Sequence, residues 1–208
     1  MAALSIMAGE WDVVLAGGAE SASLQPQRRY ADNDERSSLR NPVFTAAQFR
    51  PGEYGDDAML LGAERAAKAA GITREEADEA ALLSQERAKK AAEEGWLKDV
   101  ILPLFGSSRD EALRKRMSEK LLARAPRVTD FPEGILTAAN TCTINDGAAF
   151  VMLASERWLR ERDLVPSAEI KGFSMIGADS ALPPLSADLA VSLLLREKGL
   201  FLQRPGCL

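Results

Sequence analysis

The sequence contains no histidine among its 208 residues. Histidine is the usual general base near neutral pH and the commonest metal ligand, so a mechanism that needs an imidazole cannot come from this chain alone. Cysteine is also scarce, with only Cys142 and Cys207. Two cysteines do not make a disulfide framework, and their sparing use predicts a reducing, cytoplasmic location.

Long apolar runs and an excess of basic residues are missing as well. No run approaches the roughly 18–20 apolar residues that span a bilayer, and the N-terminus lacks the pattern of a signal peptide. The net charge is −5, whereas a nucleic-acid-binding domain favours a basic patch. With 46% hydrophobic and 27% charged residues, the composition is that of a globular protein with a real core. We therefore expect no nucleic-acid or membrane partner, and no metal site.

The most informative stretch is ILTAANTCTINDGAAFVML, residues 135–153. Residues 137–143 are small and polar, and Asn145-Asp146-Gly147 is a strong turn signal. Residues 148–153 form an uncharged apolar run, which predicts a strand buried on both faces. A small-residue loop that leads into a buried strand lets a ligand approach the backbone closely. The alternative is a tight turn before a core strand with no ligand.

Apolar patterning predicts several further elements along the chain. A helix end over residues 1–9 precedes a strand that Gly17-Gly18 should close, and residues 19–54 should be irregular. Arg28 and Arg29 in that region are either solvated or in contact with a phosphate. Strands are expected at residues 11–16, 100–104, 148–153 and 168–173, and helices at residues 56–70, 73–94, 110–122, 156–162 and 187–198.

Capping signals mark the ends of these helices. Gly71 should end the helix over residues 56–70 in a left-handed conformation. Thr73 and Glu76 have the spacing of a capping box at the start of the next helix, and Ser155 is a candidate N-cap. The apolar side of the helix over residues 56–70 is predicted to consist of Leu60, Leu61, Ala63, Ala67 and Ala70.

Four segments in the same order resemble the thiolase family of 3-ketoacyl-CoA and acetoacetyl-CoA thiolases. TAANTCTINDGAA, residues 137–149, is similar to the family's TAGNASGINDGAA. The other three segments are DVVLAGGAESAS (residues 12–23), GITREEADEAALLSQERA (residues 71–88) and GWLKDVILPL (residues 95–104). The resemblance reaches to about Gly177 and so covers most of the chain.

The resemblance implies an α/β fold: a partial thiolase-like fold with a mixed sheet, helices and an inserted helical loop domain. Residues 1–20 would end the N-terminal half and residues 21–143 would form the loop domain. Residues 144–165 would supply the final strand and helix of that half, and residues 166–208 would start the C-terminal half. The strand over residues 11–16 would pair with residues 150–154. Such a sheet leaves edges and an apolar face exposed, which predicts a partner chain that completes the fold.

The implied activity is formation or thiolysis of a carbon–carbon bond in an acyl-CoA thioester. Coenzyme A is then a substrate, and no cofactor is expected. By resemblance, Ala138, Cys142 and Thr143 would line the channel for the pantetheine arm of CoA. The charged segment that contains Arg114, Lys115 and Arg124 would lie where the CoA nucleotide binds.

The family's nucleophilic Cys motif and its His motifs do not occur in this sequence, so no residue is assigned as catalytic. Cys142 matches a position where the family has a pocket-lining Ser, although a neighbouring Lys or a helix N-terminus can activate a thiol. Asn145 and Asp146 are interpreted as turn formers, and Glu20 as a residue that stabilises the turn after Gly17-Gly18.

Three interpretations remain open at this stage. The chain is part of a thiolase-family acyltransferase whose Cys and His come from another chain. Alternatively, it is a catalytically inactive thiolase-like subunit that binds acyl-CoA or serves a structural role. The third interpretation is a truncated reading frame.

Overall fold

The computed structural model describes the chain except for residues 39–42, 45–56, 105, 111 and 201–208. The chain divides into two compact units. Unit 1 consists of Met1–Gln25, Ile144–Met175 and the chain from Ala190 onwards, and unit 2 consists of Pro26–Thr143 and Ile176–Leu189. The domain boundaries that the sequence suggested stay a prediction.

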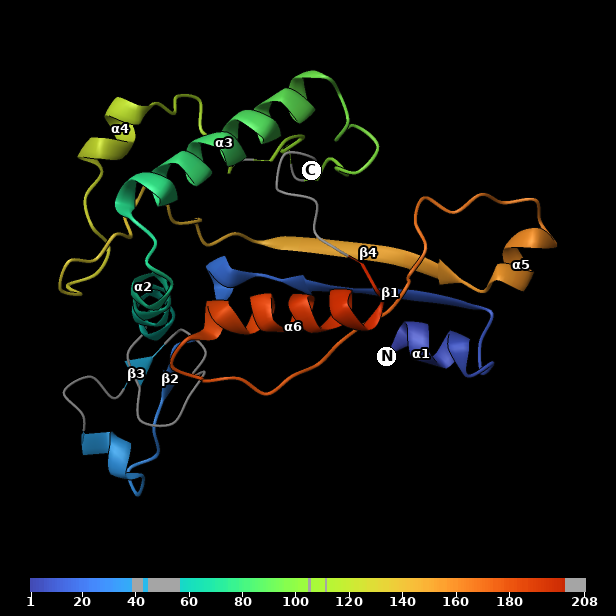
Figure 1. Cartoon of the computed structure of the whole chain (residues 1–208), viewed down its shortest axis with the longest axis horizontal. Helices are drawn as coiled ribbons and strands as arrows, with labels where there is room; N and C mark the ends of the chain where they lie inside the picture. The colour runs from blue at the N-terminus through green and yellow to red at the C-terminus, as the bar shows by residue number, and fades with distance from the viewer. Residues whose placement is uncertain (39–42, 45–56, 105, 111, 201–208) are drawn as a thin grey trace. The chain divides into compact units, whose positions relative to one another are not determined.

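Unit 1 is built on one antiparallel pair of strands, β1 (Val13–Glu20) and β4 (Gly147–Ala154). Val13 lies opposite Ala154, and Glu20 lies opposite Gly147, so the two strands run side by side over their whole length (Figure 1). Helix α1 (Ala2–Met7) contacts both strands. This register confirms the expected pairing of residues 11–16 with residues 150–154. The presence of both helices and strands confirms the α/β class.

The prediction that Gly17-Gly18 would close the first strand is wrong, because β1 continues to Glu20. The reason is tertiary. Phe150 lies opposite Gly17, and a Cβ atom on Gly17 would overlap the Phe150 ring. The glycine therefore makes room for an aromatic ring across the ladder and does not end the strand.

Strand β4 leads into α5 (Glu156–Arg160), which begins at the predicted N-cap. The Ser155 hydroxyl accepts a hydrogen bond from the Trp158 N–H and donates one of 2.7 Å to Asp12 Oδ1. The Arg157 guanidinium donates to Asp12 Oδ2 at 2.6 Å. The Ser155 hydrogen bond, followed by that of Arg157, lowers the pKa of Asp12. The beginning of β1 and the end of β4 are thus tied together.

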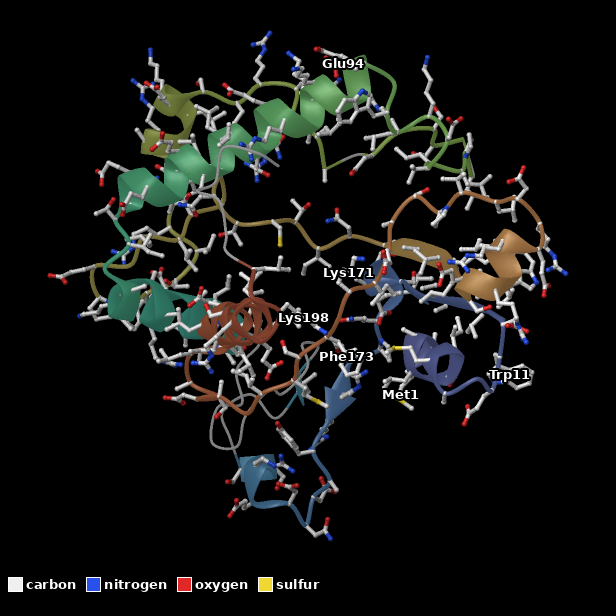
Figure 2. The ribbon with its side chains drawn as sticks, turned by 45° about the vertical axis from the view of Figure 1, so that its right-hand side comes forward. Met1, Trp11, Glu94, Lys171, Phe173 and Lys198 are labelled. Carbon is white, nitrogen blue, oxygen red and sulfur yellow. The ribbon has the colours of Figure 1, made fainter. Side chains whose placement is uncertain are left out.

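The expectation that residues 148–153 are buried on both faces is wrong for the structure of this chain. Phe150, Val151 and Met152 are 61–63% exposed. The sheet in unit 1 has two strands only among the described residues, and helix α1, which contacts both strands, leaves these side chains exposed. Trp11, just before β1, is exposed too, with its ring at the margin of the ribbon (Figure 2).

Unit 2 contains two longer helices, α2 (Ala58–Ala70) and α3 (Arg74–Glu93). Gly71 ends α2 with a φ of 68°, a left-handed conformation that glycine adopts without strain. Thr73 and Glu76 form the predicted capping box: the Thr73 side chain accepts from the Glu76 N–H, and the Glu76 carboxylate accepts from the Thr73 N–H. The local signals for this turn are therefore confirmed.

Shorter elements complete the described chain. Helix α4 (Glu119–Arg124) contacts α3, and β2 (Arg28–Arg29) pairs with β3 (Val43–Phe44). Helix α6 (Pro183–Glu197) has its first residues in unit 2 and its last residues in unit 1. It begins four residues before the predicted start at residue 187. Two 3₁₀ turns, Ala22–Leu24 and Glu35–Ser38, complete the set.

Two predicted strands do not form, and one predicted helix forms only at its end. Val100 lies in a turn, Leu104 makes an isolated bridge to Ser107, and residues 101–103 and 168–173 have no regular secondary structure. The helix predicted over residues 110–122 is present only from Glu119, as α4. Residues 112–118 are not helical, because the Gln85 side chain of α3 binds the backbone there. Gln85 Oε1 accepts from the Arg114 N–H at 2.9 Å, and its Nε2 donates to the Ala112 carbonyl at 3.4 Å.

The interior of unit 2 is small and unusually polar. Its buried apolar side chains include Ala66, Leu122 and Ala139, and they share the interior with Glu64 and Thr137. Because buried polar groups need hydrogen-bond partners, this interior specifies one arrangement of the chain around it. Within the described residues, no helix has the length and apolarity of a membrane span.

Candidate functional site

Residues 135–143 of unit 2 combine a fixed backbone with an exposed surface, and are called the anchored segment below. Thr137 is fully buried and Ala139 is 6% exposed. Ala138, Cys142 and Thr143, the three residues predicted to line a CoA channel, are exposed. The structure therefore brings the predicted lining residues to one short surface segment.

The first anchor is Glu64 of α2, which is 2% exposed. Its carboxylate accepts hydrogen bonds from the Ile135 N–H at 2.8 Å and from the Leu136 N–H at 3.1 Å. The Thr129 hydroxyl donates to the same carboxylate at 2.8 Å. A Cβ atom on Gly134 would lie 2.5 Å from Glu64 Oε1, so only glycine permits this approach. Glu64 thereby fixes the entry to the anchored segment.

The second anchor is the Asn140 side chain, which folds back on its own segment. Its Oδ1 accepts from the Thr137 N–H at 2.7 Å, and its Nδ2 donates to the Ile135 carbonyl at 3.0 Å. The same Nδ2 donates to Asp78 Oδ1 of α3 at 2.8 Å. The Thr137 hydroxyl accepts from the N–H groups of Ala139 and Asn140, both at 3.3 Å. These hydrogen bonds fix the backbone of residues 135–140 in a tight loop.

Arg114 is the third anchor, and this differs from the phosphate contact suggested for it. Its guanidinium donates to the Ala138 carbonyl at 2.6 Å. A guanidinium has five N–H donors, so one backbone contact leaves donors for an anion. Lys115 and Arg124 are exposed. Arg29, the other candidate for a phosphate contact, pairs with Asp32 at 3.5 Å.

In unit 1, Asp146 is more than a turn former. It accepts from the Ser23 hydroxyl at 2.5 Å, the Ser23 N–H at 2.8 Å and the Ser21 hydroxyl at 3.4 Å. The Ser23 side chain is the main cause of the lowered pKa of Asp146. Glu20 ends β1 and accepts from the N–H of the adjacent Ser21 at 2.9 Å, whereas the turn after Gly17-Gly18 that it was expected to stabilise does not form. Asp146 therefore ties the exit of β1 to the entrance of β4.

Two hollows lie near these elements. One, of about 230 Å³, lies beside Glu64 in unit 2 and is lined by Glu64, Ala67, Lys68, Gly71, Ile72, Phe131, Glu133 and Ile135. The other, an open hollow of about 640 Å³ in unit 1, is lined by Met1, Ala2, Ser5, Trp11 and residues 13–17. Within the described residues, no group of three or more His, Cys, Asp or Glu side chains is arranged to hold a metal ion.

Residues 1–157 match the model of the thiolase N-terminal domain. The chain belongs to the thiolase family. It is 32% identical to the acetyl-CoA acetyltransferase of Saccharomyces cerevisiae over 212 residues, which cover 96% of this chain and 53% of the yeast protein.

Solved thiolase structures give the same result for the fold. Human mitochondrial 3-ketoacyl-CoA thiolase in complex with CoA superimposes with a TM-score of 0.76 at 28% identity, over 95% of this chain and 51% of the human chain. The Acat5 thiolase from Ascaris suum, in complex with coenzyme A, superimposes with a TM-score of 0.75 at 30% identity, over 95% of this chain and 52% of that chain. The thiolase chain described here thus spans about half the length of these relatives.

Sequence reasoning identified the exposed residues of the anchored segment but not its anchors. Glu64 and Asp78 were not singled out, because acidic residues on a helix are usually solvated. One signal was present for Glu64: it is the only acidic residue within the small and apolar run AMLLGAERAAKAA of α2. No comparable local signal marked Asp78, which lies among the other acids of REEADEAA.

Proposed function

We propose that this chain supplies a CoA-binding region of a thiolase-family acyltransferase. The reaction is formation or thiolysis of a carbon–carbon bond in an acyl-CoA thioester, and Ala138, Cys142 and Thr143 contact the CoA. The observation that carries this proposal is the anchored segment, where small exposed side chains lie on a backbone held by Glu64, Asn140 and Arg114. The CoA present in the human and Ascaris relatives supports it.

The chemistry of the ligand fits such a surface. The pantetheine arm of CoA is long, uncharged and carries two amides, so it binds well along backbone whose side chains do not block it. A held backbone also lowers the ordering cost of binding. In this proposal Cys142 is a lining residue. The chain has no histidine to activate its thiol.

We further propose that another polypeptide covers the exposed sheet of unit 1 and completes the thiolase fold. Leu15, Phe150 and Met152 lie on one face of the β1–β4 pair, because Leu15 is opposite Met152 and side chains alternate along a strand. All three are more than 60% exposed. A two-stranded sheet has marginal stability by itself, so packing against another thiolase-family polypeptide stabilises it.

We also propose a cytoplasmic location, because cysteine is scarce, and an oligomeric assembly, because the sheet of unit 1 is uncovered. The proposed acyl-CoA substrate places the protein in lipid metabolism. The net charge of −5 supports a small-molecule thioester substrate in preference to nucleic acid.

A second candidate is a catalytically inactive thiolase-like subunit that binds acyl-CoA or serves as a structural partner. The observation in its favour is the lack of histidine throughout the 208 residues. Both candidates predict CoA binding by the anchored segment unless the role is purely structural. Turnover separates them.

The test is calorimetric titration of the full chain with CoA and with acetyl-CoA, together with thiolysis of acetoacetyl-CoA in the same sample. An Ala138→Glu variant places a large anion on the exposed lining. Its matched control is Ala123→Glu, an exposed alanine of α4 in the same unit. We expect Ala138→Glu to abolish binding and Ala123→Glu to retain it.

The outcomes separate the candidates clearly. Binding with turnover, alone or with a complementing thiolase half, supports the acyltransferase. Binding without turnover in either sample supports the inactive subunit. Equal affinity for CoA in both variants contradicts the assigned contact surface, and no binding to the wild-type chain contradicts the proposed function.

A further inference from the structure

We propose that Asp78 of α3 is a positioning residue, which acts through Asn140 to set the ligand-facing backbone of the anchored segment. This inference rests on the proposed function, since the ligand in question is CoA. It joins two parts of the sequence that are 62 residues apart, GITREEADEAA and TAANTC. The helix sequence thereby gains a role at the site without touching the ligand itself.

An ionised carboxylate accepts hydrogen bonds and donates none, whereas the amide of asparagine does both through different atoms. Asp78 Oδ1 lies 2.8 Å from Asn140 Nδ2. The carboxylate therefore favours, together with the Ile135 carbonyl at 3.0 Å, the orientation of Asn140 in which the NH₂ group points toward α3.

That choice decides what the other side of the amide does. With Nδ2 on Asp78, Asn140 Oδ1 accepts from the buried Thr137 N–H at 2.7 Å. The reversed amide would put an NH₂ group against this N–H donor and leave a buried donor unsatisfied. Thr137 Oγ1 in turn accepts from the Ala139 and Asn140 N–H groups. The Asp78 carboxylate thus supports the Asn140 amide bond to the Thr137 N–H, next to the Thr137 hydroxyl bonds that hold the backbone after Ala138.

Asp78 is itself held on its second oxygen. Arg74, one turn earlier on α3, donates from Nε to Asp78 Oδ2 at 2.8 Å, and its Nη2 donates to the Leu122 carbonyl of α4 at 2.5 Å. The side chain of Asp78 is 14% exposed. Its two oxygens therefore face two different elements, and the carboxylate cannot turn away without breaking a bond to one of them.

The first test measures backbone order without any ligand, by hydrogen–deuterium exchange of the full chain. Asp78→Ala is expected to speed exchange of the Thr137, Ala139 and Asn140 amides by about tenfold, the factor for losing one charged hydrogen bond. The matched control is Glu79→Ala, an exposed acid at the next position of α3. It should leave these amides unchanged.

The second test asks whether the amide orientation is what matters. Asn140→Asp places a second carboxylate against Asp78 and should disturb the same amides. The exchanged pair, Asp78→Asn with Asn140→Asp, restores one donor and one acceptor between the two side chains. It still lacks the donor to the Ile135 carbonyl, so it should recover part and not all of the protection. A general loss of packing would give no such recovery, so absence of recovery overturns the orientation mechanism.

The third readout is CoA affinity by calorimetry, where Asp78→Ala should bind about tenfold more weakly than Glu79→Ala. Faster exchange with unchanged affinity overturns the positioning role, as does unchanged exchange. If the wild-type chain binds no CoA, the proposed function fails by itself. The positioning role for a ligand then falls with it, while the exchange data alone show whether Asp78 orders the segment.

Discussion

The anchored segment of unit 2 and strand β4 of unit 1 follow each other in the sequence and differ in how they are held. The anchored segment is held by hydrogen bonds from its Ile135 N–H to Glu64 and from its Asn140 side chain to Asp78. Both acidic residues lie on helices of the same unit. Strand β4 has backbone pairing to β1 and an apolar face that remains exposed. One region carries its own support, whereas the other lacks a covering layer.

This difference separates two kinds of surface. A small-residue loop over buried polar anchors is suited to a small ligand, because its backbone is already ordered. An apolar sheet face with Leu15, Phe150 and Met152 exposed is suited to another protein layer, because an apolar patch of that kind gains free energy on burial. The two proposals for this chain, CoA binding and completion by another polypeptide, therefore concern different surfaces.

The largest expected effect comes from breaking the support of the anchored segment. Glu64→Ala leaves three donors without their acceptor: the Thr129 hydroxyl and the N–H groups of Ile135 and Leu136. We expect a loss of about 3 kcal/mol in the free energy of unfolding, measured by urea denaturation. The control is Glu86→Ala, an exposed acid on α3, which should change little. Equal effects of both variants would contradict the role of Glu64.

A smaller effect is expected at Asp146, which lies just before β4 and is hydrogen-bonded to Ser21 and Ser23 just after β1. Hydrogen bonds from Ser23 and Ser21 lower the pKa of Asp146 below its ordinary value of 3.8. A lowered pKa in the folded state gives stabilisation that is complete above the ordinary pKa and is lost as pH falls through the folded-state value. Asp146→Asn should therefore be less stable than wild type at pH 7, and the two should converge as pH falls through the folded-state pKa of Asp146, which lies below 3.8.

The comparison for Asp146→Asn is thermal unfolding at several pH values, with Asp163→Asn as the control. Asp163 is an exposed aspartate of the same unit. A gap between Asp146→Asn and wild type that stays constant from pH 7 to acid pH would contradict the charge-dependent role of Asp146.

The smallest effect on stability is expected on the sheet face of unit 1. Met152 is 63% exposed, so Met152→Lys should hardly change the unfolding free energy of the chain. The same change should prevent co-purification with a polypeptide that supplies the other half of a thiolase, since a lysine would be buried in the new interface. Met59→Lys, at an exposed methionine of α2, is the control that should still co-purify. Capture of both variants would contradict the covering layer.

Local signals in the sequence predicted the local parts of the fold. The Thr73 capping box, the Gly71 helix end and the Ser155 N-cap each depend on residues within a few positions, and all three are confirmed. Predictions that depend on distant contacts failed. The sequence around Gly17 predicts a strand end, whereas the structure places Phe150 across the ladder from it. The sequence of residues 112–114 predicts a helix, whereas the Gln85 side chain binds their backbone.

For the candidate site, the sequence predicted the exposed residues and not the contacts that hold them. Resemblance to thiolases singled out Ala138 and Cys142, which are exposed in the structure, and their contact with CoA stays a prediction. Glu64, Asp78 and their bonds to the anchored segment were not predicted, because a charged residue on a helix looks solvated until the tertiary structure shows a buried donor beside it. Cys207 lies outside the described residues.

The most direct test of this account is hydrogen–deuterium exchange of the full chain with and without CoA, followed segment by segment. We expect CoA to slow exchange over residues 137–143 and to leave β1 and β4 unchanged, because the proposed ligand and protein partner use different surfaces. Protection of β1 and β4 by CoA with no change over residues 137–143 would contradict it.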